Sequence, residues 1–503
     1  MRACVTKPLP HGLAGRRAAR RAASLWIASL WAALTALGCA PALGQPAGSS
    51  GGSATGAAPT TAAGQNGQTP DQGANAEPTA APAVEAPRLF AAGPFVAHAQ
   101  ATVVEQANDA FRAPFSGPNS LWPHANGRET ADITLYAGLR LWSGGELWVD
   151  PEVDQGFGLT GTLGAAGFPS GEAYKVGSKD PYVRVQRVFI RQTIDLGGAS
   201  QGVDADLNQL EGTTTADRLV ITVGKISVAD IFDANKYAHD PRGDFMNWTV
   251  IDAGTFDYAA DSWGYAAGAV IEWIKGRVTL RGGAFLLSDV PNSPNIDTRF
   301  DQFQAVSEAE ERHTLFGRSG VVRLTGYLSR GRMARLLDAV ALADRQGGAP
   351  DAARVRRYAG RPGVSIDIEQ ELAKDLGAFL RAGVADGRFE AYEFTDVDRS
   401  ASAGLSLGGA RWGRPDDVAG LAAVINIASK DRRLYLADGG LGLLVGDGRL
   451  PRSGPESILE GHYEVRLTRL LRLGLDAQSI VNPGYDRERG PVAILGMRLH
   501  VQL

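Results

Sequence analysis

The chain ends in LGMRLHVQL, residues 495–503, in which every odd-numbered residue is apolar and every even-numbered one is glycine or polar. A period of two is typical of a β-strand with one apolar and one polar face. The same period recurs in short segments from about residue 95 onward. A closed membrane barrel would place all these apolar faces in lipid, using strands of about 9 to 11 residues.

Further segments show the pattern clearly. Residues 133–141 and 322–329 alternate apolar side chains with threonine, tyrosine or arginine. Residues 263–273 carry tryptophan at both ends, which predicts a strand with an aromatic residue at each membrane interface. The apolar phase changes between Val185 and Val188, which predicts a β-bulge near Gln186 and Arg187.

The N-terminus resembles an export signal. Four arginines at positions 16, 17, 20 and 21 precede the apolar residues 25–37 and the small residues 42–44. We expect cleavage after Gly44; lipid attachment at Cys39 is the alternative. Because Cys4 is the only other cysteine, the chain after residue 44 contains none, which excludes disulfides and thiolate metal sites there.

Two further segments follow the signal, residues 1–44. Residues 45–90 consist mostly of small and polar residues and predict a disordered tether. Residues 91–503 predict a single barrel domain, because no change of composition divides them.

The charge balance argues against nucleic acid as a partner. Residues 1–44 hold six basic and no acidic residues, which leaves 45 basic against 55 acidic residues, a net charge of −10. Phosphate binding requires a basic surface. No later window approaches 18 apolar residues, so a membrane crossing after the signal would require a barrel.

One segment shows helical spacing. In residues 330–345, Met333, Leu336, Leu337 and Val340 recur at the interval of a helix face. This predicts a short helical insertion between strands. It would lie either against the rim of the barrel or inside the lumen.

Catalytic signatures are not found. The sequence has no His-Glu-x-x-His, no Gly-x-Ser-x-Gly and no Gly-x-x-x-x-Gly-Lys motif, and its seven histidines show no ligand spacing. Asp396 and Asp398 could bind a cation, although exposed turn residues are the simpler interpretation. We therefore expect neither an enzyme nor a cofactor or metal site.

Several loops combine charged, amide and aromatic side chains. They comprise residues 150–158, 167–174, 235–248 and 257–265. Such groups recognise sugars, whose hydroxyls form hydrogen bonds and whose C–H faces stack on rings. The same residues could instead only cap strands and brace loops.

At these loops the chain resembles the OprB-type carbohydrate-selective porins of Gram-negative outer membranes. The resemblance runs from about residue 95 to the C-terminus and rests on five motifs at residues 151–156, 167–175, 236–245, 411–417 and 482–485. It implies a barrel of about 16 antiparallel strands with infolded loops, through which mono- and small oligosaccharides diffuse. The terminal Leu503, where such barrels often have an aromatic residue, and the tether depart from the family pattern.

The sequence and the resemblance together predict an all-β, transmembrane antiparallel β-barrel with passive, weakly selective diffusion. Binding along the path must stay weak for the solute to leave. The predicted pore-lining residues are Arg140, Glu152, Asp154, Gln155, Glu172, Lys236, Tyr237, Arg242, Asp244, Arg281, Arg323 and Arg381.

Because arginines recur on the polar faces, we expect a local positive field in an otherwise acidic chain. A general or anion-preferring porin is therefore an alternative, and a soluble envelope lectin or enzyme is another. The expected partners are small carbohydrates, outer-membrane lipid and the assembly machinery. A monomer and a homotrimer are both compatible with the sequence.

Overall fold

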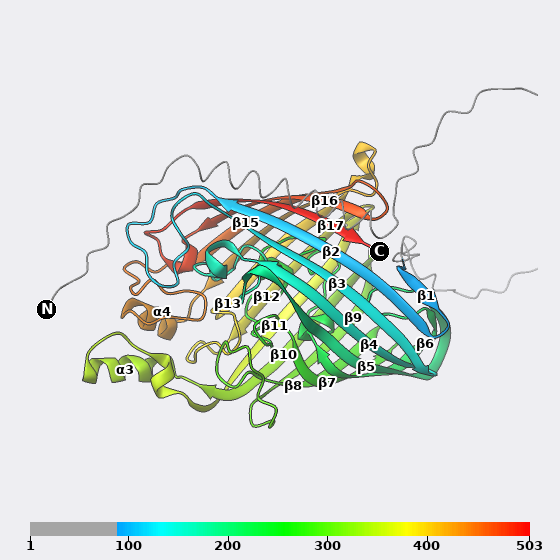
Figure 1. Ribbon diagram of the computed structural model, residues 1–503, viewed down its shortest axis with the longest axis horizontal. Helices are drawn as coiled ribbons and strands as arrows, with labels where there is room; N and C mark the ends of the chain where they lie inside the picture. Colours follow the sequence, from blue (N-terminus) through cyan, green and yellow to red (C-terminus); the bar gives the residue numbers. More distant parts are fainter. Residues whose placement is uncertain (1–87) are drawn as a thin grey trace, which may run out of the picture. The chain divides into compact units, whose positions relative to one another are not determined.

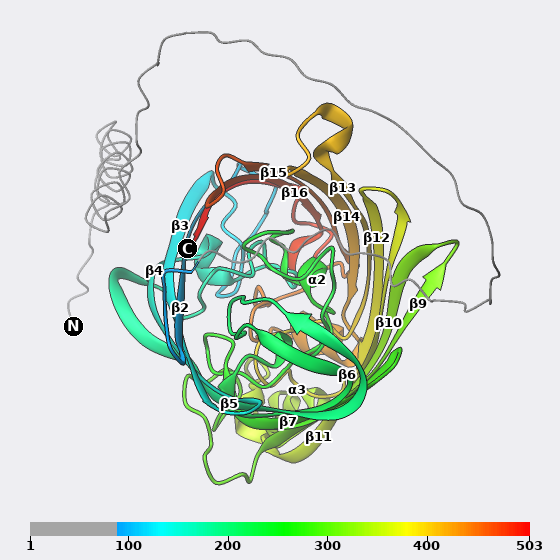
Figure 2. The ribbon, with the colours of Figure 1, turned by 90° about the vertical axis from the view of Figure 1, so that its right-hand side faces the viewer.

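Residues 88–503 are described in a computed structural model, in which they form a closed antiparallel barrel of sixteen strands with one extra strand (Figures 1 and 2). The barrel closes where β17 pairs with β2, and the extra strand β1 (Phe90–Ala92) pairs with the start of β2. The predicted signal and residues 45–87 of the predicted tether lie outside the described residues.

Each barrel strand pairs with its neighbours in sequence. The strands are β2 (Phe95–Asn108), β3 (Asn126–Trp142), β4 (Gly145–Gly156), β5 (Ser178–Val203), β6 (Gly212–Ile226), β7 (Ala266–Lys275), β8 (Val278–Leu286), β9 (Phe303–Leu315), β10 (Arg318–Met333), β11 (Arg357–Ala373), β12 (Leu376–Ala385), β13 (Arg399–Gly408), β14 (Val418–Ile427), β15 (Glu456–Arg466), β16 (Leu471–Val481) and β17 (Val492–Gln502).

Helices are short and confined to the connections. The α-helices are α2 (Trp248–Ile251), α3 (Leu336–Gln346) and α4 (Lys430–Ala437), and the 3-10 helices are η1 (Leu159–Thr162), η2 (Val228–Asp230), η3 (Ala352–Val355), η4 (Gly409–Trp412) and η5 (Pro483–Tyr485). In the part of the chain that is described, no helix has both the length and the apolar character needed to span a bilayer.

The two-residue period assigns the faces of the strands correctly. In β17, Leu495 is 65% exposed on the outside, whereas Ile494 is fully buried on the inside. In β10 the outward Leu324 is 54% exposed and the inward Thr325 is buried. The apolar series therefore points away from the lumen, as a lipid-facing wall requires.

The predicted bulge in β5 is confirmed. Arg187 pairs with Asp150 and Val185 pairs with Pro151, which leaves Gln186 as the extra residue. The predicted strand over residues 263–273 is wrong at its start, because β7 begins at Ala266. Trp263 instead lies in the preceding loop, where the Arg184 guanidinium carbon is 3.4 Å from its ring centre.

The predicted helical insertion is found, shifted along the chain. Residues 330–333 continue β10, and the helix begins at Leu336. Helix α3 packs against α4 at the end of the barrel, as the rim alternative predicts (Figure 1).

The two ends of the barrel differ. At one end, long connections join β2 to β3, β4 to β5, β6 to β7 and so on around the ring, and α3 and α4 belong to them (Figure 1). At the other end most connections are short, such as residues 143–144, 276–277, 316–317 and 374–375. Figure 2, viewed toward the short-turn end, shows ribbons inside the ring of strands. The long loops that fill the lumen position the candidate site.

Candidate functional site: a constricted pore

Loop 157–177, between β4 and β5, is fixed to the inner wall by side chains from distant strands. Glu456 on β15 accepts hydrogen bonds from the backbone N–H groups of Ala166 (2.9 Å) and Gly167 (2.7 Å). Gln106 on β2 and Gln478 on β16 both donate to the carbonyl of Pro169. The loop is therefore held against one side of the barrel.

Loop 227–265, between β6 and β7, is held against the same side. Arg381 on β12 donates to the carbonyls of Ala238 and Val250, both at 2.7 Å. Arg498 on β17 donates to the carbonyls of Pro241 (2.6 Å) and Asp244 (3.0 Å). These two buried guanidiniums satisfy backbone acceptors that irregular loop structure would otherwise leave unpaired.

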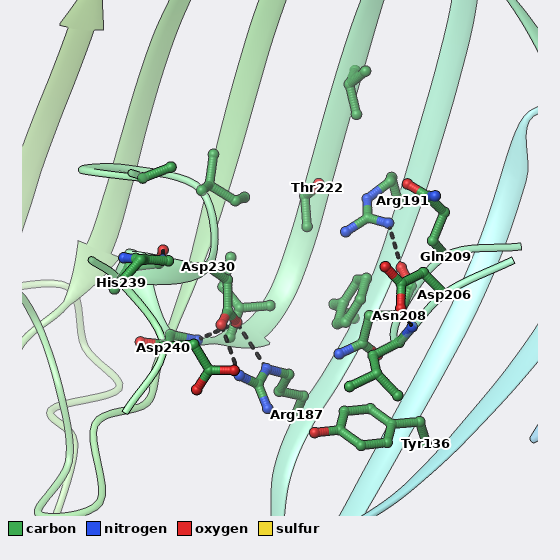
Figure 3. A pocket seen from close by; sticks show the side chains of 18 of the residues that line it. Tyr136, Arg187, Arg191, Asp206, Asn208, Gln209, Thr222, Asp230, His239 and Asp240 are labelled. Atoms are coloured by element: carbon green, nitrogen blue, oxygen red, sulfur yellow. Dashed lines mark hydrogen bonds and ion pairs between the residues drawn. The ribbon is translucent and has the colours of Figure 1, made fainter. Parts of the chain in front are cut away.

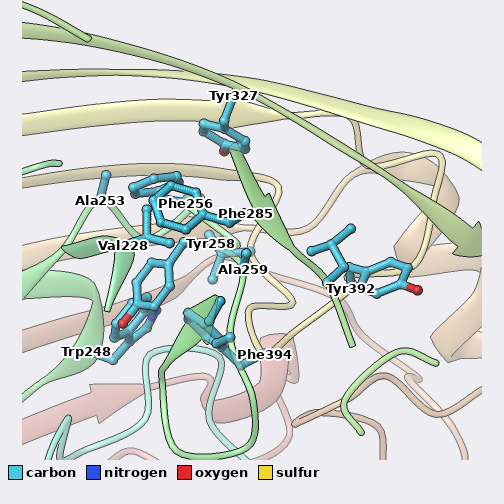
Figure 4. Close-up of a cluster of buried hydrophobic side chains, with 14 of the residues drawn as sticks. Val228, Trp248, Ala253, Phe256, Tyr258, Ala259, Phe285, Tyr327, Tyr392 and Phe394 are labelled. Atoms are coloured by element: carbon cyan, nitrogen blue, oxygen red, sulfur yellow. The ribbon is translucent and has the colours of Figure 1, made fainter. Parts of the chain in front are cut away.

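An aromatic cluster joins the infolded loops to each other and to the wall. Phe168 and Trp248 stack with ring centres 5.4 Å apart, and Trp248 meets Phe394 edge to face at 4.7 Å. Figure 4 shows Trp248, Tyr258 and Phe394 together, with Tyr327 of the wall beyond them. Burial of these rings makes the loops a packed wall of the pore.

A cavity of about 1590 Å³ remains on the opposite side of the lumen. It is bordered by inward side chains of β3 to β8, by the two infolded loops and by the connection between β5 and β6. Figure 3 shows Tyr136, Arg187 and Thr222 from the wall facing Asp230, His239 and Asp240 from loop 227–265. This volume is large enough for a solute the size of a small oligosaccharide.

One charged group at the cavity centres on Arg242. Its Nη2 lies 2.7 Å from Glu172 Oε1 and 3.7 Å from both Asp132 Oδ1 and Glu152 Oε2. Burial raises the pKa of Glu172 despite the neighbouring guanidinium. Burial disfavours the charge of Arg242, but Glu172 and Asp132 keep its pKa well above the usual value. Arg242 is thus a permanent cation among several carboxylates.

A second charged group lies beside the first. Arg187 on β5 forms a bidentate pair with Asp230, at 2.7 and 2.8 Å, and its guanidinium lies 4.9 Å from the ring centre of Tyr265. Tyr136 borders the cavity next to it (Figure 3). Charged pairs next to ring faces offer both hydrogen bonds and stacking surfaces.

Several residues that border the cavity have a buried polar atom with no hydrogen-bond partner among the described residues. The atoms include both donors and acceptors, as a sugar hydroxyl requires of its binding site. These atoms are Tyr174 Oη, Asn208 Oδ1, Thr222 Oγ1, Arg242 Nε and Trp248 Nε1.

The prediction of a local positive field is wrong. The arginines on the polar faces of the strands, which were expected to supply this field, are surrounded by carboxylates or loop carbonyls. Arg281 lies within 2.9 Å of Glu272, Glu308 and Glu310. Arg323 lies within 3.3 Å of three carboxylates, those of Glu310, Asp367 and Glu369.

Arg381 pairs with Asp367 in addition to holding the loop, and Arg140 donates to the carbonyl of Glu211. On the inner wall, positively and negatively charged side chains therefore lie next to one another.

The predicted pore-lining residues of β4 divide between its two faces. Glu152 and Asp154 point into the lumen, where Gln186 donates to both. Gln155, one position later, lies on the opposite face of β4 and donates to the carbonyl of Lys179, so its assignment to the pore is corrected.

Three predicted residues serve the architecture of loop 227–265. The backbone N–H of Lys236 donates to Glu369, and the ring of Tyr237 packs over Gly377. Asp244 accepts the N–H groups of His239 and Asp240, which closes a turn. None of the three borders the cavity.

The interpretation of Asp396 and Asp398 as exposed turn residues is also wrong. Both are buried, and Arg432 on α4 pairs with each, at 2.7 and 2.8 Å. Across residues 88–503, no group of three or more potential metal ligands is found.

The geometry agrees with the comparison to protein families. Residues 119–503 match the model of the carbohydrate-selective porin, OprB family. The chain belongs to this family. It is therefore an outer-membrane porin for small sugars, and its outer wall faces lipid.

One solved structure supports the fold. The high-pH structure of Pseudomonas putida OprB is 16% identical, with a TM-score of 0.61, over 82% of this chain and 94% of that one. The low-pH structure of the same protein is 13% identical (TM-score 0.45; 82% and 93%), and the outer membrane channel DcaP of Acinetobacter baumannii is 10% identical (TM-score 0.44; 81% and 97%). A search of curated proteins gave no match.

Several cavity residues of this porin were missed in the sequence. Arg187 and Tyr136 lie on strands whose polar face was recognised, but only the position of loop 227–265 shows which part of that face stays open. Trp248 closes the aromatic-rich segment 235–248, which was noted as a candidate sugar-binding loop. Arg191 could have been found from the sequence. Beyond the bulge in β5 the even-numbered residues are apolar and face lipid, so the odd-numbered residues, including Arg191, must face the lumen.

Proposed function

We propose that small neutral sugars cross this porin through the cavity between the β3 to β8 wall and loops 157–177 and 227–265. The observation that carries this proposal is that residues with unpartnered donors and acceptors, such as Tyr174, border the same cavity as the stacked rings of Phe168 and Trp248. A sugar would satisfy these groups with its hydroxyls and place its C–H face against the rings. Each contact is weak, so the sugar can also leave.

The paired charges of Arg242 with Glu172 and of Arg187 with Asp230 supply oriented dipoles along this route. A neutral polar solute exchanges hydrogen bonds with such pairs without bringing a charge into a partly buried site. An anion attracted by an arginine is repelled by the carboxylates next to it, and a cation attracted by a carboxylate is repelled by the arginine. The arrangement therefore favours neutral sugars over anions, and it gives no support to an anion-preferring pore.

The orientation follows from the two ends of the barrel. Outer-membrane barrels have short periplasmic turns and longer external loops. We therefore assign the end with α3 and α4 to the outside and the end with residues 143–144 and 276–277 to the periplasm. Export through the signal at residues 1–44, folding by the outer-membrane assembly machinery, and a monomeric or trimeric state remain parts of the proposal, as does the absence of a catalytic role.

The test uses a hydroxyl that has no partner. Tyr174→Phe removes only Oη, so folding should be unaffected, while block of ion current by glucose and by a maltooligosaccharide in planar bilayers should weaken several-fold. Tyr392→Phe is the matched control, because the Tyr392 hydroxyl lies 2.7 Å from Gln302 Oε1 and 3.1 Å from the carbonyl of Ser288, and Tyr392 does not border the cavity. It should lower stability and leave sugar block unchanged.

If sugars block the current equally in the parent and in Tyr174→Phe, the Tyr174 hydroxyl does not contact the sugar on its way through the cavity. Failure of the parent to pass glucose in a liposome-swelling assay, with ions still conducted, would overturn the sugar assignment itself and favour a general porin.

A further inference from the structure

Strands β5 and β6 extend beyond their neighbours at the short-turn end. Gln192 pairs with Gly145, the first residue of β4, and Arg218 pairs with Ile274 near the end of β7. Between these points, residues 194–217 form backbone pairs only with each other. We call this two-stranded segment the ribbon.

The ribbon folds back into the lumen. Its tip, residues 204–211, borders the cavity, and Asn208 Nδ2 lies 2.9 Å from Asp150 Oδ2, which is well inside the barrel on β4. Arg191 of the wall donates to the carbonyl of Asn208 at 2.7 Å (Figure 3). A ribbon that continued straight along β5 would carry its tip away from Asp150.

Two glycines permit the ribbon to bend back into the lumen. The pairing of β5 with β6 shifts on both sides of Gly197, and Gly197 and Gly198 have φ values of +116° and +86°. Residues with side chains rarely adopt such angles. The two bulges increase the local bend of the ribbon at the rim of the barrel.

The tip faces the same space as the charged pairs of the pore. Figure 3 shows Asp206, Asn208 and Gln209 beside Tyr136, with Arg187 and Thr222 across from them. Leu210 is buried in the aromatic cluster, and Glu211 accepts from Arg140 and pairs with Arg88. The tip is thus a polar surface at the periplasmic side of the cavity, anchored by side chains of the wall.

Given that sugars cross this cavity, we propose that the inward-folded ribbon sets the size limit of the pore at its periplasmic exit. In the conducting state the tip stays inside the lumen, and a sugar passes between the tip and the wall at Tyr136 and Arg187. A monosaccharide or short oligosaccharide fits beside the tip, whereas a longer chain is excluded. The ribbon is a specificity element made by a turn on the periplasmic side, separate from the two infolded loops of the outer end.

The first test shortens the ribbon. In a variant lacking residues 200–215, Gly197 to Ala199 and Ala216 form the remaining turn. Liposome swelling should then admit maltooligosaccharides that the parent excludes, and single-channel conductance should rise at least twofold. A shortened porin that folds but keeps the conductance and size limit of the parent would overturn the inference, whereas a parent that does not pass glucose would instead overturn the proposed function.

The second test keeps the full ribbon. In Asp150→Cys/Asn208→Cys, a short bifunctional thiol reagent should link the tip to the wall, and each single-cysteine variant is the control. The linked porin should keep the conductance and size limit of the unlinked one. Closure of the channel by the link would show that the tip leaves the lumen when the pore conducts, and would equally overturn the inference.

Discussion

The outer and inner faces of the same strands are specified by different physics. On the outer face, Leu324, Leu380 and Leu495 are about half exposed toward lipid, and any apolar side chain of suitable size serves there. On the inner face, Arg323, Arg381 and Arg498 each bind particular carboxylates or loop carbonyls. The outer face therefore requires only that apolar residues alternate along the strand, whereas the inner face requires particular residues in contact. Substitutions on the inner face should cost more stability than apolar substitutions on the outer face.

The largest expected effect is at Arg381 on the inner face. Arg381→Met removes the donor to the carbonyls of Ala238 and Val250 and leaves Asp233 buried without its cation, while Asp367 keeps only Arg323. Loss of one partner from a buried ion pair costs about 3–5 kcal/mol. Urea-unfolding midpoints in detergent would measure this loss.

Leu380→Met, on the outer face of the same strand, is the matched control, and it should cost less than about 1.5 kcal/mol because it conserves volume. Similar losses at the two positions would contradict the distinction between the faces.

The second prediction places a charge on the outer face. Leu324→Arg should cost about 2–4 kcal/mol and slow assembly, since an arginine near the middle of the membrane must be solvated there. Heat-modifiable migration on a denaturing gel would report the folded fraction. The control is Ser319→Arg on the inner face of β10, where Glu371 lies close to the serine hydroxyl. Thr325 would be a poor control, because it is buried and donates to Glu308.

A smaller loss is expected at the anchor of loop 157–177. Glu456→Gln replaces one of two carboxylate oxygens that accept the N–H groups of Ala166, Gly167 and Gly484. Unsatisfied buried donors cost about 1–3 kcal/mol, so the loop should loosen, and the noise of the open-channel current should increase. Glu311→Gln at a half-exposed surface site should leave both stability and noise as in the parent.

The fold could be predicted because the lipid-facing residues recur at every second position along each strand. The phase of β3, β10 and β17 and the break near Gln186 could all be read along the chain. Gln155 could have been placed as well, since it has the opposite phase to Glu152 and Asp154. The role of Arg381 could not, because its carbonyl partners are more than a hundred residues away and reach it only once loop 227–265 has folded inward.

The fourth prediction concerns ion selectivity. Arg242→Gln removes the cation next to Asp132, Glu152 and Glu172 and leaves the carboxylates. Reversal potentials under a salt gradient should therefore shift toward cation preference, by a several-fold change in permeability ratio. Arg299→Gln, at an exposed site on loop 287–302, should leave the ratio unchanged. A shift toward anions after removal of Arg242 would contradict the charge arrangement described here.

The smallest effect is expected at His239, on loop 227–265 and at the border of the cavity. Burial disfavours its charge, but the adjacent Asp252, 3.5 Å from Nδ1, raises its pKa to about 9. Because this pKa is higher than the ordinary value of 6.5, the pair stabilises the fold fully below about pH 6.5. That contribution is lost as the pH rises through about 9. Unfolding midpoints of the parent, compared with His239→Gln between about pH 6 and 10, should therefore converge toward the alkaline end. The difference between the two profiles isolates His239 from other groups that titrate in this range, including Lys175, whose pKa burial lowers to about 8. A constant difference across the range would show that the imidazole acts by packing and not by its charge.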